Sequence, residues 1–375
     1  MASPDLPDPF GTLTDRLLAG LPPAWGNAPV SQDQETAPVL LVKALFYRNF
    51  SGLPFVVSAP PNACALAADR ALDFIAAQGG LAVRRLGDCP PRAIRLLRER
   101  EILPQRAVAF PGKKGFKYLA TAPDAASWIL VNEVEHLTTG RLFPGCPSPE
   151  GLAALHAPPR EDARMPWAWS GDFGYLASDP SRLGPGLSLE WVVHLPGLAL
   201  SRQLPHARNY LAAAGCGFLP VSAPHPSDPA TAAADAGMFR LSFRGRLGQT
   251  LPEIHADFLG AVRLVLRREL EARRRCSEKH HKRLEERAHR ALRTLAEASA
   301  LAYPELAAQA SIIRMAAWLG MLSPQIPGIL EELRVTAGSG HLAVTSGRDL
   351  SKEEEDFARA NVVRLSLLKH SGEIA

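Results

Sequence analysis

This sequence has few cysteines, no long apolar run and no large excess of charge of either sign. Its five cysteines lie far apart and form no C-x-x-C pair, at Cys64, Cys89, Cys146, Cys216 and Cys276. A zinc site or a disulfide framework is therefore not favoured. No stretch approaches the about 18 uninterrupted apolar residues of a membrane-spanning helix, and residues 1–10 lack the basic start and apolar core of a signal peptide. We expect a soluble protein of the cytoplasm.

The balance of charge in the chain gives no support for a nucleic-acid partner. There are 42 basic and 38 acidic residues, which gives a formal net charge of +4. The basic run at 271–290 is interrupted by glutamates and contains no aromatic residue. We interpret it as the solvated face of a helix, and we expect neither nucleic acid nor a membrane as a partner.

The chain is long enough for two or three domains, since 46% of its 375 residues are hydrophobic. Helical spacing of apolar residues predicts helices at 63–78 and 91–103. Short apolar runs predict strands at 38–42, 54–57, 107–110, 117–120, 128–131, 189–195 and 239–243. Stretches dense in Pro, Gly or Ala predict loops at 145–161 and 220–234.

Beyond Pro252 the pattern becomes helical, because Ile254, Phe258, Val262 and Val265 recur at helical spacing while strand signals become rare. We therefore predict an α+β domain at 1–250, in which residues 1–35 are a flexible or helical lead-in. A mostly helical domain is predicted at 251–375.

Several segments together resemble the ATP:guanido phosphotransferase family, in particular its bacterial protein-arginine kinase branch. Residues 132–137 read NEVEHL, where the family pattern is N-E-E-D-H-L. Residues 174–186 read GYLASDPSRLGPG and are followed by HLP at 194–196, which is similar to the family's G-Y-L-T-S-C-P-T-N-L-G-T-G and H-L-P. Arg48-Asn49 before GLPF resembles the end of S-x-R-x-R-L-A-R-N. Residues 354–360, EEDFARA, resemble the R-D-x-x-R-A motif of the protein-arginine kinases.

This resemblance implies a fold and a reaction. The implied fold is a curved antiparallel sheet backed by helices, of the guanido kinase catalytic-domain type, followed by a helical domain that forms a homodimer. The implied reaction is transfer of the ATP γ-phosphoryl group to a protein arginine. A regulatory protein, a paralogous kinase or a protease adaptor is the kind of partner that the family suggests.

Phosphoryl transfer needs Mg²⁺ and several cations around the phosphates. The five arginine positions of the family fall here on Lys43, Leu45, Thr138, Ser188 and the neighbourhood of Leu219. Only Lys43 keeps a positive charge. Arg182, in the turn at 174–186, is a further candidate for a nucleotide contact.

The acceptor side is altered as well. A guanidinium stays protonated in water, so carboxylates must orient it and accept its proton. The acceptor-positioning Glu of the family is Val134 here, and the family's Cys near the acceptor is Asp179. Glu133 matches the Glu that the family associates with Mg²⁺ through water.

The C-terminal motif forms a phosphoarginine pocket in the family. Here Asp356 and Arg359 match it, while Glu355 replaces its first arginine and would repel a phosphoryl group. Ser351 and Glu354 have the spacing of a helix capping box.

We hypothesise a pseudokinase, which keeps the scaffold, has lost the chemistry, and acts through protein contacts. Two alternatives stay open. One is an active Mg²⁺- and ATP-dependent protein-arginine kinase with a rearranged site that uses Lys43, Glu133, Asp179 and Arg182 or Arg141. The other is a sensor that binds a nucleotide or phosphoprotein without turnover. ATP and Mg²⁺ are expected as cofactors only if the site is functional.

Overall fold

The computed structural model of the chain describes residues 34–104, 114–123, 125–147, 151, 166–221 and 237–370. Within these residues an eight-stranded sheet has the order β2-β3-β4-β5-β1-β8-β10-β9, and every neighbouring pair is antiparallel. Its strands are β1 (Val39–Arg48), β2 (Ala82–Arg85), β3 (Tyr118–Thr121), β4 (Ser127–Val131), β5 (Leu137–Pro144), β8 (Leu187–His194), β9 (Gly217–Pro220) and β10 (Met238–Arg244). A separate hairpin pairs β6 (Trp169–Ser170) with β7 (Gly174–Tyr175).

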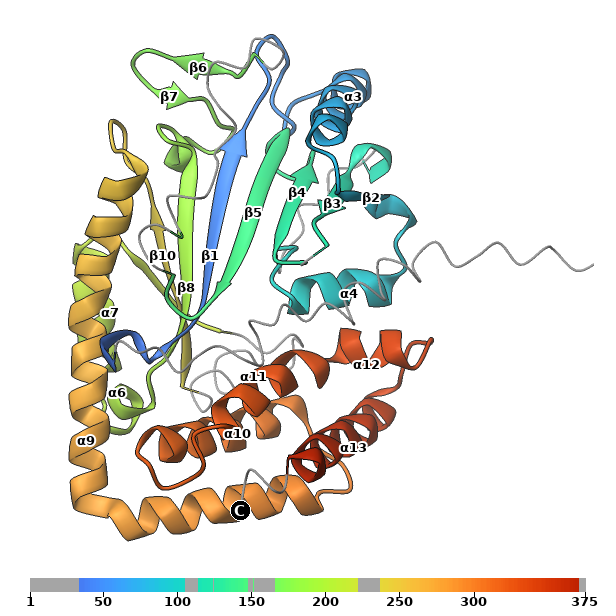
Figure 1. Cartoon of the computed structure of the whole chain (residues 1–375). Coiled ribbons are helices and arrows are strands. Elements are labelled where there is room, and N and C mark those ends of the chain that lie inside the picture. The colour runs from blue at the N-terminus through green and yellow to red at the C-terminus, as the bar shows by residue number, and fades with distance from the viewer. Residues whose placement is uncertain are drawn as a thin grey trace, which may run out of the picture.

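Helices surround this sheet and form a second layer below it (Figure 1). The α-helices are α3 (Pro61–Gln78), α4 (Pro91–Glu99), α6 (Pro196–Leu200), α7 (Leu204–Ala213), α9 (Leu251–Glu297), α10 (Tyr303–Trp318), α11 (Ile326–Thr336), α12 (Ser339–Thr345) and α13 (Lys352–Lys369). Short 3₁₀ turns are η1 (Gln34–Thr36), η2 (Leu86–Asp88), η3 (Lys114–Phe116) and η4 (Pro180–Arg182). None of these helices has the length and apolar character to cross a bilayer.

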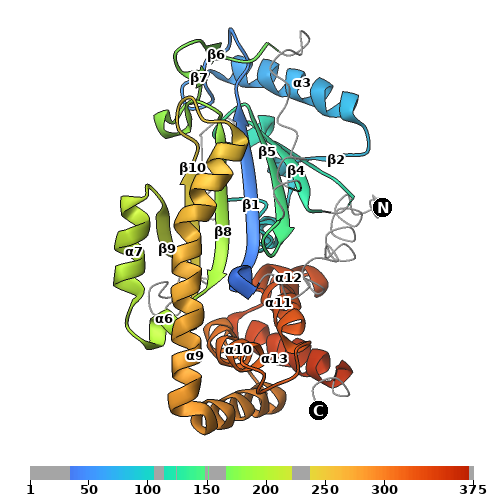
Figure 2. The same cartoon turned by 60° about the vertical axis from the view of Figure 1, so that its left-hand side comes forward.

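One face of the sheet, which we call the outer face, is covered by α9 and α3. Val42, Ala44 and Phe46 of β1 point to it, because successive side chains alternate across a strand. Phe258 of α9 packs edge-on against Trp191 with ring centroids 5.1 Å apart, and Figure 2 shows α9 crossing this face. Burying each such side chain contributes about 1.5–3 kcal/mol to folding.

The opposite face carries Lys43, Leu45 and Tyr47 of β1, and we call it the inner face. Part of it is an apolar core shared with Leu96 and Leu97 of α4 and with Val335 of α11. Trp128 lies so flat over this face that a Cβ on Gly140 would be 2.3 Å from its indole ring. The inner face is therefore partly filled by side chains of the chain itself.

Helix α9 connects the sheet layer to the helical layer. Its backbone leaves helical geometry at His280 (φ −137°, ψ 26°), and Figure 1 shows it bending there to run beneath the molecule. Ile254, Phe258 and Val262 before the bend belong to the core of the sheet, while Ala291 and Leu295 after it pack with the C-terminal helices. The domain division at residue 250 stays a prediction, since this one helix takes part in both cores.

The predicted fold class, an antiparallel α+β sheet followed by a helical region, is confirmed. The strand predicted at 54–57 is wrong: the carbonyl of Phe55 accepts hydrogen bonds from the amides of Ser58 (3.0 Å) and Ala59 (2.8 Å), which makes this segment a turn. The helix predicted at 91–103 ends earlier, at Glu99. The strand predicted at 107–110, most of the two predicted loops and the lead-in before residue 34 lie outside the described residues.

Candidate functional site

The sheet brings four of the five family arginine positions together on the inner face. Lys43 and Leu45 follow one another on this side of β1, Ser188 stands opposite Leu45 on β8, and Thr138 stands opposite Tyr47 on β5. The fifth position, Leu219, is on the edge strand β9 and is 62% exposed. The four positions for which the resemblance implies phosphate binding are therefore neighbours on the inner face.

Lys43 is part of a buried ion cluster of two cations and two anions, which we call the quartet. Its Nζ lies 2.8 Å from a carboxylate oxygen of Glu190 and 3.3 Å from one of Glu101. Arg240 of β10 bridges the same carboxylates, at 2.6 Å from Glu101 and 2.9 Å from Glu190. Two positive and two negative charges compensate one another, so Lys43 presents no uncompensated charge to a phosphate.

The pKa shifts of Lys43, Glu101 and Glu190 indicate that the members of the quartet stabilise one another's charges. Burial acts to lower the pKa of Lys43, but the charges of Glu190 and Glu101 outweigh it and the pKa is raised. Burial acts to raise the pKa of Glu101, but Arg240 and Lys43 lower that pKa to about 2. The pKa of Glu190 is lowered by the same two cations against the effect of burial. All four groups are therefore charged at neutral pH, and each stabilises the charge of the others.

Glu101 reaches the quartet through an unusual end of α4. Its φ is +62°, a left-handed conformation that favours glycine and costs other residues about 1–2 kcal/mol. The amides of Glu101 and Ile102 bond to the carbonyls of Arg98 and Leu97, which is the hydrogen-bond pattern of a Schellman motif. Because Glu101 replaces the usual glycine here, its carboxylate is aimed at Lys43 and Arg240. This turn also explains why α4 is shorter than predicted.

The neighbouring part of the inner face is polar but carries no cation at the family positions. The hydroxyl of Tyr47 lies 3.0 Å from that of Ser188. The guanidinium of Arg182 stacks over the Tyr47 ring, 4.3 Å from its centroid. Arg182 therefore lies beside Tyr47 of the inner face, and it approaches from the turn at 174–186 rather than from the sheet.

Arg182 is the last residue of η4 and Asp179 directly precedes this turn, so the two lie together as the sequence predicted. Arg182 pairs with the fully buried Glu135 at 3.3 Å and with Asp179 at 3.7 Å. Asp179 caps η4 by accepting from the amide of Ser181 (3.0 Å), and it lies 3.6 Å from Arg244. Burial acts to raise the pKa of Asp179, but the hydrogen bonds from Ser181 and the charges of Arg244 and Arg182 lower it. This cluster is more exposed than the quartet, since half of the Arg244 side chain is accessible.

Residues 132–137 form a buried hub between β4 and β5. Glu133 accepts a charged hydrogen bond from Lys117 at 2.6 Å, so its nearest cation is a lysine. The Nδ1 atom of His136 accepts from the amide of Phe50 (3.0 Å), and burial lowers the pKa of His136. Val134 is half-buried, and its carbonyl accepts from Ser178. No group of three or more His, Cys, Asp or Glu side chains in the described residues could hold a metal ion.

The C-terminal motif at 354–360 packs α13 against the other helices. The guanidinium of Arg359 donates to the carbonyls of Ala337 and Leu301, both at 2.8 Å, and pairs with Asp356 at 2.6 Å. Its remaining nitrogen lies 3.7 Å from Glu355, which in turn accepts from Ser339 at 2.6 Å. The capping box at Ser351 and Glu354 is confirmed. Asp356 and Arg359 are therefore brought together among the C-terminal helices, where the charge of Arg359 acts on Glu99 of α4.

The predicted site residues thus fall into separate groups. Asp179 and Arg182 share one cluster, Asp356 and Arg359 share another, and Lys43, Glu133 and Val134 have other neighbours. Arg141, an alternative cation, is paired with Ala44 and so points to the outer face. ATP phosphates do not fit the five positions, because Lys43 is already compensated by two carboxylates and the other four side chains are neutral.

Sequence reasoning missed Glu101, Glu190 and Arg240. Two of them carried a signal: Glu190 and Arg240 are single charges inside otherwise apolar strands, as Lys43 is, and opposite charges at alternate strand positions suggest partners. Glu101 gave no such signal in the sequence, because no glycine marks the left-handed turn in which it lies.

Comparison with known proteins identifies the family to which this fold and these motifs belong. The family profile described as ATP:guanido phosphotransferase, C-terminal catalytic domain, matches residues 75–272, more than half of the 375 residues. The chain therefore belongs to the ATP:guanido phosphotransferase family. The profile described as protein-arginine kinase McsB C-terminal domain matches residues 281–374. The predicted family and branch are confirmed by these two matches.

Individual protein-arginine kinases are similar to this chain over most of its length. The chain is 28% identical over 337 residues to the protein-arginine kinase of Symbiobacterium thermophilum, covering 88% of this chain and 93% of that one. It is 28% identical over 286 residues to that of Halalkalibacterium halodurans (75% and 77% covered), and 30% identical over 240 residues to that of an Exiguobacterium species (64% and 67%).

Solved structures show the same fold at lower identity. A lombricine kinase matches with a TM-score of 0.50 at 18% identity, covering 62% of this chain and 67% of that one. The duplicated taurocyamine kinase of Schistosoma mansoni with transition-state analogue components matches with a TM-score of 0.52 at 16% identity, and this chain covers 33% of it.

Proposed function

We propose that this chain is a catalytically silent homologue of the protein-arginine kinases, which acts through contacts with other proteins. The observation that carries the proposal is the quartet. The one family cation position that keeps a charge, Lys43, is compensated by Glu101 and Glu190 and lies beside a second internal cation, Arg240.

The number of catalytic groups that this chain lacks at the family positions supports the proposal. Removal of one preorganised electrostatic donor costs an enzyme about 10²–10³ in rate. Leu45, Thr138, Ser188 and Leu219 replace four donors, and Val134 replaces a carboxylate that positions the acceptor. Even with strong non-additivity, little rate enhancement would survive.

A second candidate function, nucleotide sensing without turnover, is favoured by the cluster at η4. Arg182 stacks over Tyr47 at the edge of the inner face, and Arg244 is half-exposed beside it. Two arginines can hold a phosphate group through bidentate hydrogen bonds. Asp179 between them opposes this role, because its charge is the one that they already neutralise.

The first experiment is a calorimetric titration of the full chain with Mg·ATP at low salt, followed by a phosphorylation assay on an arginine-rich protein. We expect no binding heat and no phosphoarginine above the background without enzyme. Metal-dependent arginine phosphorylation by the pure protein would refute the silent assignment and favour a rearranged active site.

The sensor has its own signature in the same experiment. It requires saturable ATP binding without turnover, lost in the R182Q/R244Q double variant and kept in Arg208→Gln, an exposed arginine on α7. Saturable binding would also raise the melting temperature with ligand concentration.

We also propose that the chain forms a homodimer through its helical region at 251–375, as the resemblance implies. Light scattering after size-exclusion chromatography measures the mass directly. A mass of one chain, about 40 kDa, at micromolar concentration would contradict the dimer.

A further inference from the structure

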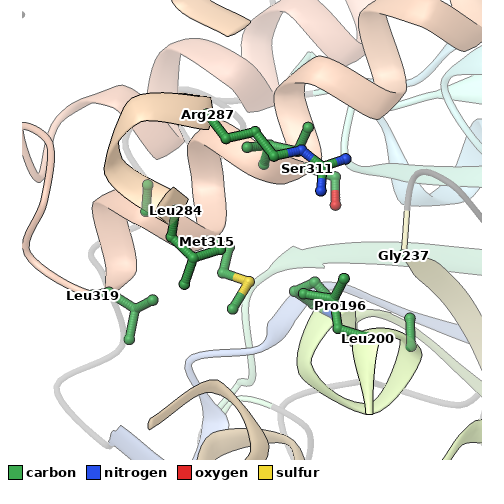
Figure 3. A pocket seen from close by; sticks show the side chains of 11 residues that line it. Pro196, Leu200, Gly237, Leu284, Arg287, Ser311, Met315 and Leu319 are labelled. Atoms are coloured by element: carbon green, nitrogen blue, oxygen red, sulfur yellow. The ribbon is translucent and has the colours of Figure 1, made fainter. Parts of the chain in front are cut away.

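A cavity of about 260 Å³ lies outside the inner face, between α6, the second half of α9, and α10 (Figure 3). Most of its wall is apolar. The larger apolar side chains that line it are Pro196 and Leu200 from α6, Leu284 from α9, Ile312 and Met315 from α10, and Leu319 beyond the end of α10. In Figure 3 the thioether of Met315 points into the space toward Pro196. Such a wall matches the body of an aliphatic ligand.

One end of the cavity is polar. Figure 3 shows the guanidinium of Arg287 and the hydroxyl of Ser311 at the same end. Ser311 is only 4% exposed, and its hydroxyl has one hydrogen-bond partner in the described residues, the Nε2 atom of His194 at 2.8 Å. A buried hydroxyl can donate one hydrogen bond and accept others, so the direction of this bond decides what Ser311 offers to a ligand.

The surroundings of His194 set that direction. Its Nδ1 atom faces Nη2 of Arg273 at 3.4 Å, and a guanidinium can only donate, so Nδ1 is the acceptor. Burial and the charges of Arg273 and Arg314 hold the pKa of His194 well below its usual range, which keeps the ring neutral. The single ring proton is then on Nε2 and is donated to Ser311. The Ser311 proton is left to donate into the cavity.

The charge at the polar end is positive. A second cavity of about 450 Å³ adjoins the first and shares Arg287 and Ile312 with it. Three arginines, Arg283, Arg287 and Arg290, line this second cavity against one acidic side chain, Glu286. In the part of the chain that the structure describes, the Arg287 guanidinium forms no ion pair or hydrogen bond. An anionic group at this end would meet both Arg287 and the Ser311 hydroxyl.

We propose that this cavity binds an acyl carboxylate, that is, an aliphatic chain with a carboxylate head. The chain would occupy the space around Met315, Leu284 and Leu200, and the carboxylate would accept hydrogen bonds from Arg287 and Ser311. A bare phosphate or nucleotide fits less well, since most of the wall offers it no polar partner. The site is independent of the inner face, so it does not depend on whether the chain is a kinase.

The test is a calorimetric titration of the full chain with decanoate, decan-1-ol and acetate. Decanoate should bind at least about ten-fold more tightly than decan-1-ol, because a charged hydrogen bond is worth roughly ten-fold or more in affinity. Acetate, which has the head without the chain, should give no heat. Equal affinity for decanoate and the alcohol, or no decanoate binding at millimolar concentration, would overturn the proposal.

Variants separate the two ends of the site. Arg287→Gln should weaken decanoate about ten-fold and leave decan-1-ol unchanged, whereas Met315→Trp should fill the cavity and weaken both. Arg293→Gln is the matched control, because Arg293 is exposed on the same helix and lines neither cavity. An Arg287→Gln protein that binds decanoate as tightly as the Arg293→Gln control would contradict the assigned head-group site. Preferential binding of an acidic amphipathic peptide that decanoate cannot displace would assign the cavity to a protein partner instead.

Discussion

Single charged residues in this protein hold together segments that are far apart in the sequence. Glu99 at the end of α4 is the clearest case outside the quartet. Its buried carboxyl accepts from the amides of Gly340 (2.7 Å) and His341 (3.1 Å) at the start of α12. Burial raises the pKa of Glu99 to about 7, although the two amides act to lower it. This carboxyl therefore titrates near neutral pH, in contrast to Glu101 two residues later.

This shift predicts a pH dependence of stability. Between about pH 4.5 and pH 7 the folded protein binds more protons at Glu99 than the unfolded chain, so the free energy of unfolding falls as pH rises through this window. A shift of this size corresponds to about 3 kcal/mol. Buried histidines such as His341, whose pKa is lowered to about 3 by burial and by Arg100, act in the opposite direction. A comparison of variants is therefore needed.

Urea unfolding of wild type and Glu99→Gln at several pH values measures the contribution of Glu99 to the pH dependence of the free energy of unfolding. The variant should gain about 3 kcal/mol relative to wild type between pH 4.5 and pH 8, because it keeps no titrating group at this position. Glu278→Gln, at an exposed position on α9, should run parallel to wild type. Parallel curves for Glu99→Gln and wild type would show that Glu99 does not titrate in this window.

Among the elements, α13 contains the motif for which the resemblance implies a phosphoarginine pocket, and here its arginine holds the helix in place. Arg359 joins α13 to the carbonyl of Ala337 after α11 and to that of Leu301 before α10. With Asp356 and Glu355 beside it, each guanidinium nitrogen has a partner within the chain. Arg359 therefore fixes the position of α13 against the neighbouring helices.

We expect Arg359→Ala to lower the free energy of unfolding by about 3–5 kcal/mol, since it leaves buried carboxylates and carbonyls without a donor. Arg359→Lys should recover little of this loss, because an ammonium cannot reproduce the planar set of donors. Arg364→Ala on the same helix is the control and should cost about 1 kcal/mol or less, because Arg364 has fewer buried contacts. Equal losses for Ala at 359 and 364 would contradict this account, as would calorimetric binding of phosphoarginine by the wild-type chain.

At the scale of the whole molecule, the sheet layer and the helical layer are joined where α12 packs on α4. Gly340 makes this contact possible: a Cβ there would be 2.3 Å from the amide nitrogen of Leu96 and 2.7 Å from the carbonyl carbon of Arg95. Both atoms are backbone, so the neighbour cannot move aside cheaply. Together with the Glu99 bonds, this contact fixes the helical layer against the inner-face core.

Two glycine-to-alanine variants test the contact. In an open helix this change stabilises by up to about 1 kcal/mol, which we expect for Gly260→Ala on α9, where a Cβ would have nothing within 4 Å. Gly340→Ala should instead destabilise by about 1–3 kcal/mol through overpacking, and calorimetry should show the helical layer unfolding before the sheet. A stabilised Gly340→Ala protein would mean that the two layers are not closely packed at this point.

The family and the order of most elements could be predicted from the amino-acid sequence alone. Local signals sufficed for these, because apolar periodicity predicts helices and strands, and motifs are read directly from neighbouring residues. The capping box at Ser351 is of this kind. The same local reasoning failed at 54–57, where an apolar run forms a turn.

The roles of the buried charges could be read only from the folded structure. The partners of Lys43 are 58 and 147 residues away in the chain, and those of Glu99 are more than 200 residues away. No local pattern encodes contacts between residues so far apart in the chain. The left-handed backbone conformation of Glu101 likewise has no signal in the sequence. Whether a charge is available to a substrate depends on burial and on nearby opposite charges, and both are properties of the folded chain.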